Sequence, residues 1–168
     1  MNRPQPNEYP NWAEKYIQLV EQENVIPILE KQAQEFPDFL TNLIEKAAYA
    51  YAPEKWTITE LVAHIIDTER ILCFRLLSFA RGDNNSLPGF DEDAYVKNAH
   101  FADRSLFSLG EEFSLLRKAN LYLFKSLNET ELNRGGIASE MFMTVRALLF
   151  IMAGHLIHHT NIIKERYA

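Results

Sequence analysis

The chain has 168 residues, of which 47% are hydrophobic, and a formal net charge of −6. This size and composition suit one folded domain spanning residues 1–168 and argue against disorder. The 17 basic residues are scattered rather than clustered, which argues against a nucleic-acid partner. An acidic protein that acts on a small-molecule substrate fits this charge better.

The number of cysteines and the length of the apolar stretches indicate the cellular compartment in which the protein is expected. Cys73 is the single cysteine, so no internal disulfide forms, and a reducing cytoplasm is expected. The first residues are polar and lack the apolar run of a signal peptide. The longest apolar stretch, residues 147–154, is too short to cross a bilayer. We therefore expect a cytoplasmic protein with no membrane partner.

The first half of the chain is predicted to form a short helical segment and two long helices. The short segment covers residues 12–22, and the first long helix covers about 26–47. Pro27 suits the first turn of this helix, where its missing N–H has no intrahelical partner, and Pro37 is a candidate bend. The second long helix begins at Thr57, because Thr57-Ile58-Thr59-Glu60 has the pattern of a capping box, and ends near Arg81.

The second half is predicted to contain a long connection and two more helices. The connection covers about 84–102 and has an acidic core that can hold one helical turn. Asp103 is a candidate cap for a helix ending near Asn128, Arg134-Gly135-Gly136 marks a loop, and the last helix covers about 144–167. Four long helices and no convincing strand predict an all-α fold, a four-helix bundle. The middle connection is too long for a simple up-down hairpin.

Three of the five histidines lie in the sequence His155-Leu-Ile-His158-His159 of the last helix. Either His155 and His159 or His155 and His158 can share a helix face. At about 100° per residue, His155 and His159 fall in the middle of an apolar stripe and His158 falls on its flank. That stripe also contains Leu148, Ile151, Met152 and Ile162, and the opposite, wet side is marked by Arg146, Asn161 and Lys164.

Burying two polar imidazoles one turn apart in an apolar stripe is costly unless their nitrogens find partners. One reading is a pair of neutral histidines that hydrogen-bond to buried groups. The other is a metal ion, which takes a lone pair from each ring and so removes the desolvation difficulty. The second reading needs a third ligand from another helix.

His64 is the candidate third ligand. It lies at the edge of the apolar stripe of the second long helix, on the side of Thr68 and Arg75. Alone it would more commonly be an exposed or hydrogen-bonded histidine, but the pair His155 and His159 makes it a candidate. Three protein ligands leave an open position, the pattern of catalytic rather than structural metal sites. His100 lies in the connection and is expected to be solvated.

Two acidic residues and the cysteine have open roles. Glu69 lies within the apolar stripe of its helix; a buried pair with an arginine is the favoured reading, and a carboxylate that acts at the metal site is the other. Asp67 could orient a histidine, although an exposed aspartate is the simpler expectation. Cys73 falls on the apolar side, where it is expected to be a small core residue.

Four segments together resemble the DinB-like superfamily, a damage-inducible family of small metalloproteins. They are residues 56–70 (WTITELVAHIIDTER), Arg81-Gly82-Asp83, residues 87–96 (LPGFDEDAYV) and residues 153–159 (AGHLIHH). The resemblance covers about residues 12–167. It implies a four-helix bundle, often dimeric, with a divalent metal on three histidines, which by motif are His64, His155 and His159. Leu156 stands at a position where many members carry a charged residue, but this position is not a metal ligand.

The resemblance also implies a chemistry. The family metal is commonly nickel or zinc, with iron or manganese in some members. Better understood relatives are transferases or isomerases that use low-molecular-weight thiols such as bacillithiol, mycothiol or glutathione. The first hypothesis is therefore a metal-dependent S-transferase, or a hydrolase that uses the same site. The second is a non-enzymatic metal-binding stress-response protein, and the third an interaction module whose histidines only pack. The protein is also expected to form a homodimer.

Overall fold

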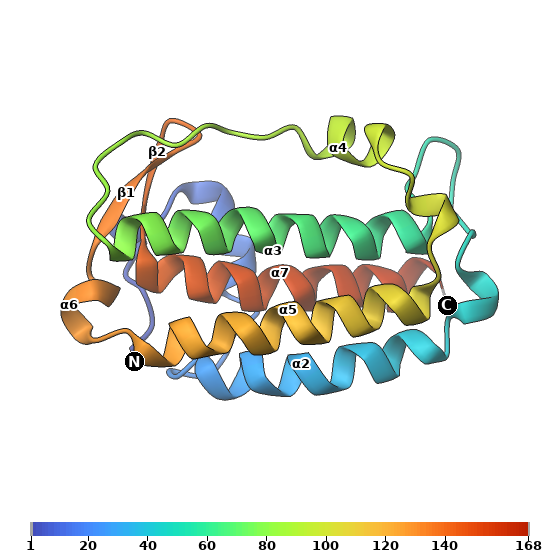
Figure 1. Ribbon diagram of the computed structural model, residues 1–168, viewed down its shortest axis with the longest axis horizontal. Helices are drawn as coiled ribbons and strands as arrows, with labels where there is room; N and C mark the ends of the chain where they lie inside the picture. Colours follow the sequence, from blue (N-terminus) through green and yellow to red (C-terminus); the bar gives the residue numbers. More distant parts are fainter. Residues whose placement is uncertain (1, 168) are drawn as a thin grey trace.

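The computed structural model describes residues 2–167. Within them four long helices lie side by side along the molecule (Figure 1), which confirms the predicted all-α bundle. Their bounds are α2 (Ile26–Thr41), α3 (Ile58–Ala80), α5 (Leu106–Ser126) and α7 (Val145–Arg166). Helix α2 packs along α5, and α3 packs along α7.

The long middle connection determines the direction in which the long helices run. It runs from the end of α3 back along the bundle, through the short helix α4 (Glu92–Asn98), so that α3 and α5 point the same way (Figure 1). Helices α2 and α7 point the opposite way. A short helix, α1 (Glu14–Ile17), packs against α7, and α6 (Glu129–Leu132) follows α5.

Side-chain caps mark where the long helices α3, α5 and α7 begin. The predicted capping box of α3 is present: Glu60 N donates to Thr57 Oγ1 at 3.2 Å, and Thr57 N donates to Glu60 Oε2 at 2.8 Å. The predicted cap at Asp103 is wrong, since Asp103 ends a 3-10 turn and Ser105 caps α5 instead. Ser105 and Asp103 are both good capping residues, so local sequence alone could not choose between them.

Helix α2 passes through Pro37 but ends at Thr41, short of the predicted residue 47. Pro37 cannot donate to the carbonyl of Ala33, and Ser114 Oγ of α5 donates to that carbonyl instead, at 2.8 Å. The missing intrahelical hydrogen bond is thereby replaced from the neighbouring helix. Similarly, only Glu14–Ile17 of the predicted segment 12–22 is α-helical, after two 3-10 turns.

A β-hairpin stands where the sequence predicted a loop at Arg134-Gly135-Gly136. Strands β1 (Gly135–Ala138) and β2 (Met141–Thr144) pair antiparallel, and Leu87 of the middle connection bridges to Ala138. The turn residues Ser139 and Glu140 have φ of 52° and 64°. Such turns usually carry Asn-Gly or Asp-Gly, so this hairpin has a weak sequence signal.

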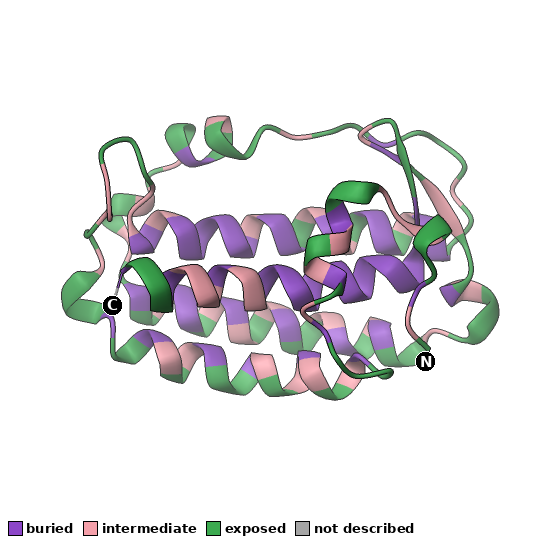
Figure 2. Ribbon diagram, turned by 180° about the vertical axis from the view of Figure 1, so that it is seen from behind, coloured by how far each residue is buried: buried purple, intermediate pink, exposed green. Residues whose placement is uncertain are grey.

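The core consists of two apolar clusters that meet on α7. Ala153 belongs to one cluster and Leu156 to the other, so His155 lies at their junction. Figure 2 shows that buried residues dominate α3 and α7, whereas α2 and α5 have clear exposed faces. No helix among residues 2–167 is long and apolar enough to cross a membrane.

The prediction that Arg146 lies on the solvent-exposed side of the last helix is wrong. This side chain is buried and pairs with Glu129 at 3.0 Å and with Glu8 at 3.7 Å. The N-terminal segment covers the start of α7, a tertiary contact that helix periodicity cannot reveal.

Candidate metal centre

The structure brings the imidazoles of His64, His155 and His159 together. His64 comes from the first half of α3, and the other two lie one turn apart on α7, which packs along α3. One ring nitrogen from each residue lies within 4.8 Å of the others. The Nε2 atom of His155 is 3.2 Å from that of His64 and 3.1 Å from that of His159.

Burial keeps these rings neutral at pH 7. All three side chains are buried, and burial lowers the pKa of His64 to about 4 and that of His159 to about 3. Burial also holds the pKa of His155 well below its usual value, and the neighbouring imidazoles lower it further. Neutral imidazole is the form that offers a lone pair to a metal.

The donor set fits a metal ion better than it fits hydrogen bonding alone. A neutral imidazole forms one hydrogen bond through Nε2, yet the Nε2 of His155 faces two others. Two nitrogens bound tetrahedrally to one zinc at ~2.1 Å would lie ~3.4 Å apart, close to the separations here. Among residues 2–167 no carboxylate or thiol joins the cluster. A three-imidazole set suits borderline metals such as zinc and nickel.

Aromatic rings hold the imidazoles in place from both sides. Trp56 packs on His64 with ring centroids 4.7 Å apart, and Tyr16 packs edge-on to His155 at 5.5 Å. Thr68 Oγ1 lies 3.5 Å from His64 Nδ1. His159 Nδ1 has no hydrogen-bond partner within residues 2–167, so packing against its neighbours orients that ring.

Two hollows reach the histidines from different sides. One, of about 340 Å³, is lined by His64 and His155; the other, of about 240 Å³, is lined by His159. A small molecule in either one contacts the cluster. The three rings therefore form a buried centre with an open approach.

Comparison with known proteins identifies the family. The model of the DinB superfamily matches residues 28–163, a span that contains all three histidines. The chain belongs to the DinB superfamily. Among solved structures it is similar to YfiT from Bacillus subtilis, described as a probable metal-dependent hydrolase with an unusual four-helix bundle topology. The sequences are 17% identical, the TM-score is 0.72, and the match covers 96% of this chain and 89% of YfiT. The search of curated proteins finds no match.

At this identity, the likeness to YfiT establishes the fold. Both proteins are four-helix bundles. The resemblance inferred from the sequence motifs is thus confirmed for family and fold.

The other histidines of this DinB-superfamily chain lie outside the cluster. His158 is half-buried on the flank of α7 and packs against Tyr16, with ring centroids 5.3 Å apart. His100 is exposed in the middle connection, as expected. His159 is buried in the cluster and His158 lies on the flank, as the helix periodicity predicted; that His159 rather than His158 binds a metal stays a prediction.

Glu69 belongs to a buried polar network rather than to the histidine cluster. Arg117 donates to both of its carboxylate oxygens at 2.6 Å, and Asn120 donates to one of them at 3.2 Å. Arg117 also donates to Gln32, which in turn donates to the Ala153 carbonyl at 2.9 Å. The network ties α2, α3, α5 and α7 together, which agrees with the favoured reading of Glu69.

Asp67 and Cys73 do not contact the centre. Asp67 pairs with Arg70 at 3.3 Å, one turn along α3. Cys73 is half-buried and donates to Asn120 at 3.2 Å, and burial raises the pKa of its thiol to about 11. A thiol in this state is a poor nucleophile at neutral pH.

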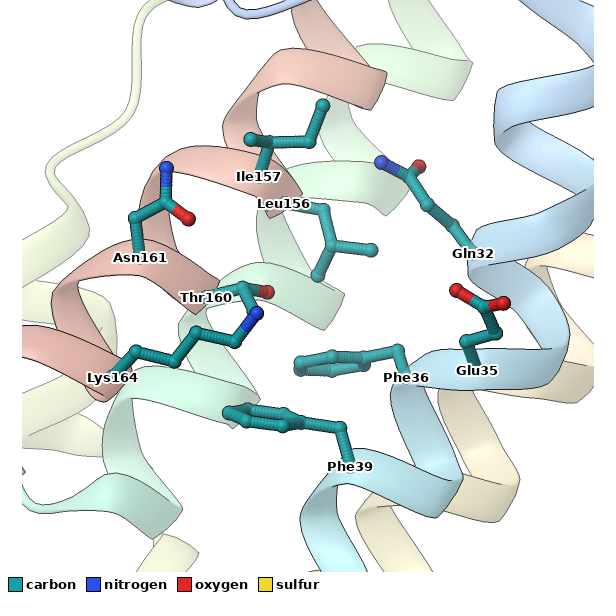
Figure 3. A pocket seen from close by; sticks show the side chains of 9 residues that line it. All are labelled: Gln32, Glu35, Phe36, Phe39, Leu156, Ile157, Thr160, Asn161 and Lys164. Carbon is teal, nitrogen blue, oxygen red and sulfur yellow. The ribbon is translucent and has the colours of Figure 1, made fainter. Parts of the chain in front are cut away.

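A further hollow lies on the far face of α7, between this helix and α2 (Figure 3). Its volume is about 220 Å³, and Ile157, Thr160 and Lys164 face Phe36 and Phe39 across it. Of the residues that line it, Glu35 alone is of a type that binds metals readily. This hollow is therefore not part of the candidate centre.

Proposed function

We propose that the chain is a metal-dependent enzyme that acts on a small molecule at the three-histidine centre. The observation that carries the proposal is the convergence of three buried, neutral imidazoles beside a cavity of about 340 Å³. A purely structural site would be expected to close around its ion with a fourth protein ligand.

The residues have distinct parts in this proposal. His64, His155 and His159 would hold the ion through Nε2, and Trp56 and Tyr16 pack against the rings of His64 and His155. When bound, a divalent metal such as zinc or nickel supplies an open position that lowers the pKa of a water or thiol there. The cavity holds the second reactant next to that position.

Hydrolysis and thiol transfer are the two reactions that this centre suits. In hydrolysis water is the nucleophile, and YfiT, which shares the fold, is described as a probable metal-dependent hydrolase. In thiol transfer a low-molecular-weight thiol attacks an electrophile, as the motif resemblance implies. Both need the same histidines, and they differ only in the nucleophile that enters the cavity.

The test is turnover by the metal-loaded protein. Hydrolysable esters and amides, and electrophiles paired with bacillithiol, mycothiol or glutathione, are assayed with zinc and with nickel. We expect turnover in one of the two panels, loss of it in His155→Ala, and retention in His158→Ala. Stoichiometric metal binding without turnover in either panel would favour the alternative, a non-enzymatic metal-binding stress-response protein.

A further inference from the structure

The cavity beside His64 and His155 extends along α3 to a second polar group. Its volume is about 340 Å³, and its far end is lined by Arg75 and Ser139. This volume is at the lower end of small-molecule sites. The cavity thus joins the histidine cluster to a buried arginine.

Arg75 is a buried cation without an anionic partner. Its side chain is 4% exposed, and Nη2 donates to the Pro88 carbonyl at 2.9 Å and to Ser139 Oγ at 3.0 Å. It forms no ion pair with a carboxylate of residues 2–167, and Nε and Nη1 have no hydrogen-bond acceptor there. Those two nitrogens are therefore available to a ligand in the cavity that Arg75 lines.

The other buried arginines show what Arg75 lacks. Arg117 makes a two-pronged pair with Glu69, and Arg146 pairs with Glu8 and Glu129. Buried guanidinium groups are normally paired, because removing an unpaired charge from water is costly. Burial accordingly lowers the pKa of Arg75. An anion from a ligand would supply the missing partner.

The cavity lining is cationic although the protein is acidic. The buried Arg75 and the exposed Lys15 line it together with one acid, the exposed Glu92, in a chain of net charge −6. Lys15 Nζ lies 4.7 Å from the centre of the Tyr16 ring. The local charge therefore favours an anionic ligand.

Ser139 adds a hydrogen-bond donor at the same end. Its hydroxyl accepts from Arg75, which leaves its own proton free to donate. The left-handed turn of the hairpin, together with the hydrogen bond from Ser139 N to the Leu87 carbonyl at 3.1 Å, holds it there. Arginine and hydroxyl donors side by side suit a planar carboxylate.

Helix geometry places His64 and Arg75, which line the two ends of the cavity, on the same side of α3. His64 and Arg75 are eleven residues apart on nearly the same face of α3, about 16 Å along the axis at 1.5 Å per residue. Long helical side chains tend to lean toward the N-terminus of their helix, and His64 lies in that direction from Arg75. A ligand anchored at Arg75 presents its other end to the histidines.

We propose that Arg75 and Ser139 form a carboxylate-binding subsite, so that the ligand is a small molecule with a carboxylate at one end. Its other end, a carbonyl or a thiol, reaches the histidines. That second contact rests on the proposed function, whereas the contact with Arg75 does not. The carboxylate can belong to a carbonyl substrate or to a thiol reactant, and the experiment separates the two.

The test is calorimetric binding of paired probes to the zinc-loaded protein. One series has ω-carboxyalkyl hydroxamates and their methyl esters, and the other has ω-mercaptocarboxylic acids and their methyl esters, each with graded chain lengths. At the best length we expect the acid to bind about tenfold more tightly than its ester, or better, because charge-assisted hydrogen bonds are the stronger kind. The series that shows the larger preference identifies the source of the carboxylate.

Variants assign the preference to Arg75. Arg75→Met should bring the acid-to-ester ratio to about one, with ester affinity within about threefold of wild type, and Arg75→Lys should keep part of the preference. Circular dichroism and zinc content confirm that both variants fold. Equal affinity for acid and ester in the wild type, or a preference that survives Arg75→Met, would overturn the proposal.

Failure of the metal site would look different. The protein would then retain no zinc, and neither ester would bind. The metal-free protein still tests the subsite, because the contact with Arg75 needs no metal. In the metal-free protein the acid should again bind more tightly than its ester. Equal affinity of acid and ester there would count against the subsite alone.

Discussion

His64 and His155 are 91 positions apart in the chain, yet their Nε2 atoms lie 3.2 Å apart. The spacing of His155 and His159 on one helix face was readable from the sequence, because it depends only on helix geometry. The approach of His64 depends on how α3 packs along α7, so the sequence offered it as a candidate and the motif resemblance supported it. The cationic end of the cavity at Arg75 and Ser139 was not predicted, since a hairpin with a weak signal creates it.

At the residue scale, the buried histidines make the stability of the metal-free protein depend on pH. Their pKa values in the folded state, about 4 for His64 and about 3 for His159, lie below the unfolded value of about 6.5. Below pH ~6.5 the unfolded state binds more protons, so the free energy of unfolding falls as the pH decreases. Above that pH these groups have no effect.

Urea denaturation of the metal-free protein at pH 7 and pH 5 measures this dependence. His64→Asn should lose less stability than wild type over this interval, whereas His100→Asn, at an exposed position, should match wild type. An identical loss of stability in His64→Asn and wild type would contradict the account.

At the element scale, helix packing rests on a polar network and on one glycine. The Glu69–Arg117 pair is buried, with both side chains at most 3% exposed. The sequence identified Glu69 as an acid in an apolar stripe, but its partner lies 48 positions away on α5. The β-hairpin pairs with Leu87 of the middle connection, a tertiary contact that local patterns do not contain. The start of α5 was a choice between two good capping residues, Asp103 and Ser105.

Breaking the buried pair should destabilise the bundle. Arg117→Met leaves the Glu69 carboxylate buried without its main partner, and we expect a loss of about 3–5 kcal/mol in the free energy of unfolding. The double variant Glu69→Leu with Arg117→Met removes both charges and should recover much of that loss. Urea denaturation measures each value, and a double variant less stable than the single one would refute this explanation.

Gly154 permits the close contact of α1 with α7. A Cβ at this position would overlap the carbonyl of Tyr16, the residue whose ring packs against His155. Gly154→Ala should therefore destabilise the protein by roughly 1–3 kcal/mol, although alanine favours helices. Gly110→Ala is the control: its Cβ would meet Pro37 and Leu40 at ordinary distances of 3.4–3.5 Å, so it should be neutral or stabilising by up to about 1 kcal/mol. Equal thermal shifts in the two variants would be inconsistent with this contact.

At the scale of the whole molecule, the bundle follows from four amphipathic or apolar helices and one long return connection. Family membership and fold agree with the expectations from the sequence. Residues 145–156 of α7 are all buried within one chain, so no second subunit is needed to cover them.

The homodimer remains a prediction that rests on the family resemblance. Light scattering at micromolar concentration should give about twice the chain mass of 19.5 kDa. A mass of one chain over the same concentration range would show that the protein works as a monomer.

The central claim is that His64, His155 and His159 together hold one divalent metal. Its most direct test is elemental analysis after reloading with zinc or nickel and removal of unbound metal. We expect one ion per chain in wild type and in His158→Ala, and loss of stoichiometric binding in His64→Ala, His155→Ala and His159→Ala. Retention of metal by His159→Ala with loss in His158→Ala, or no binding by wild type, would contradict the account.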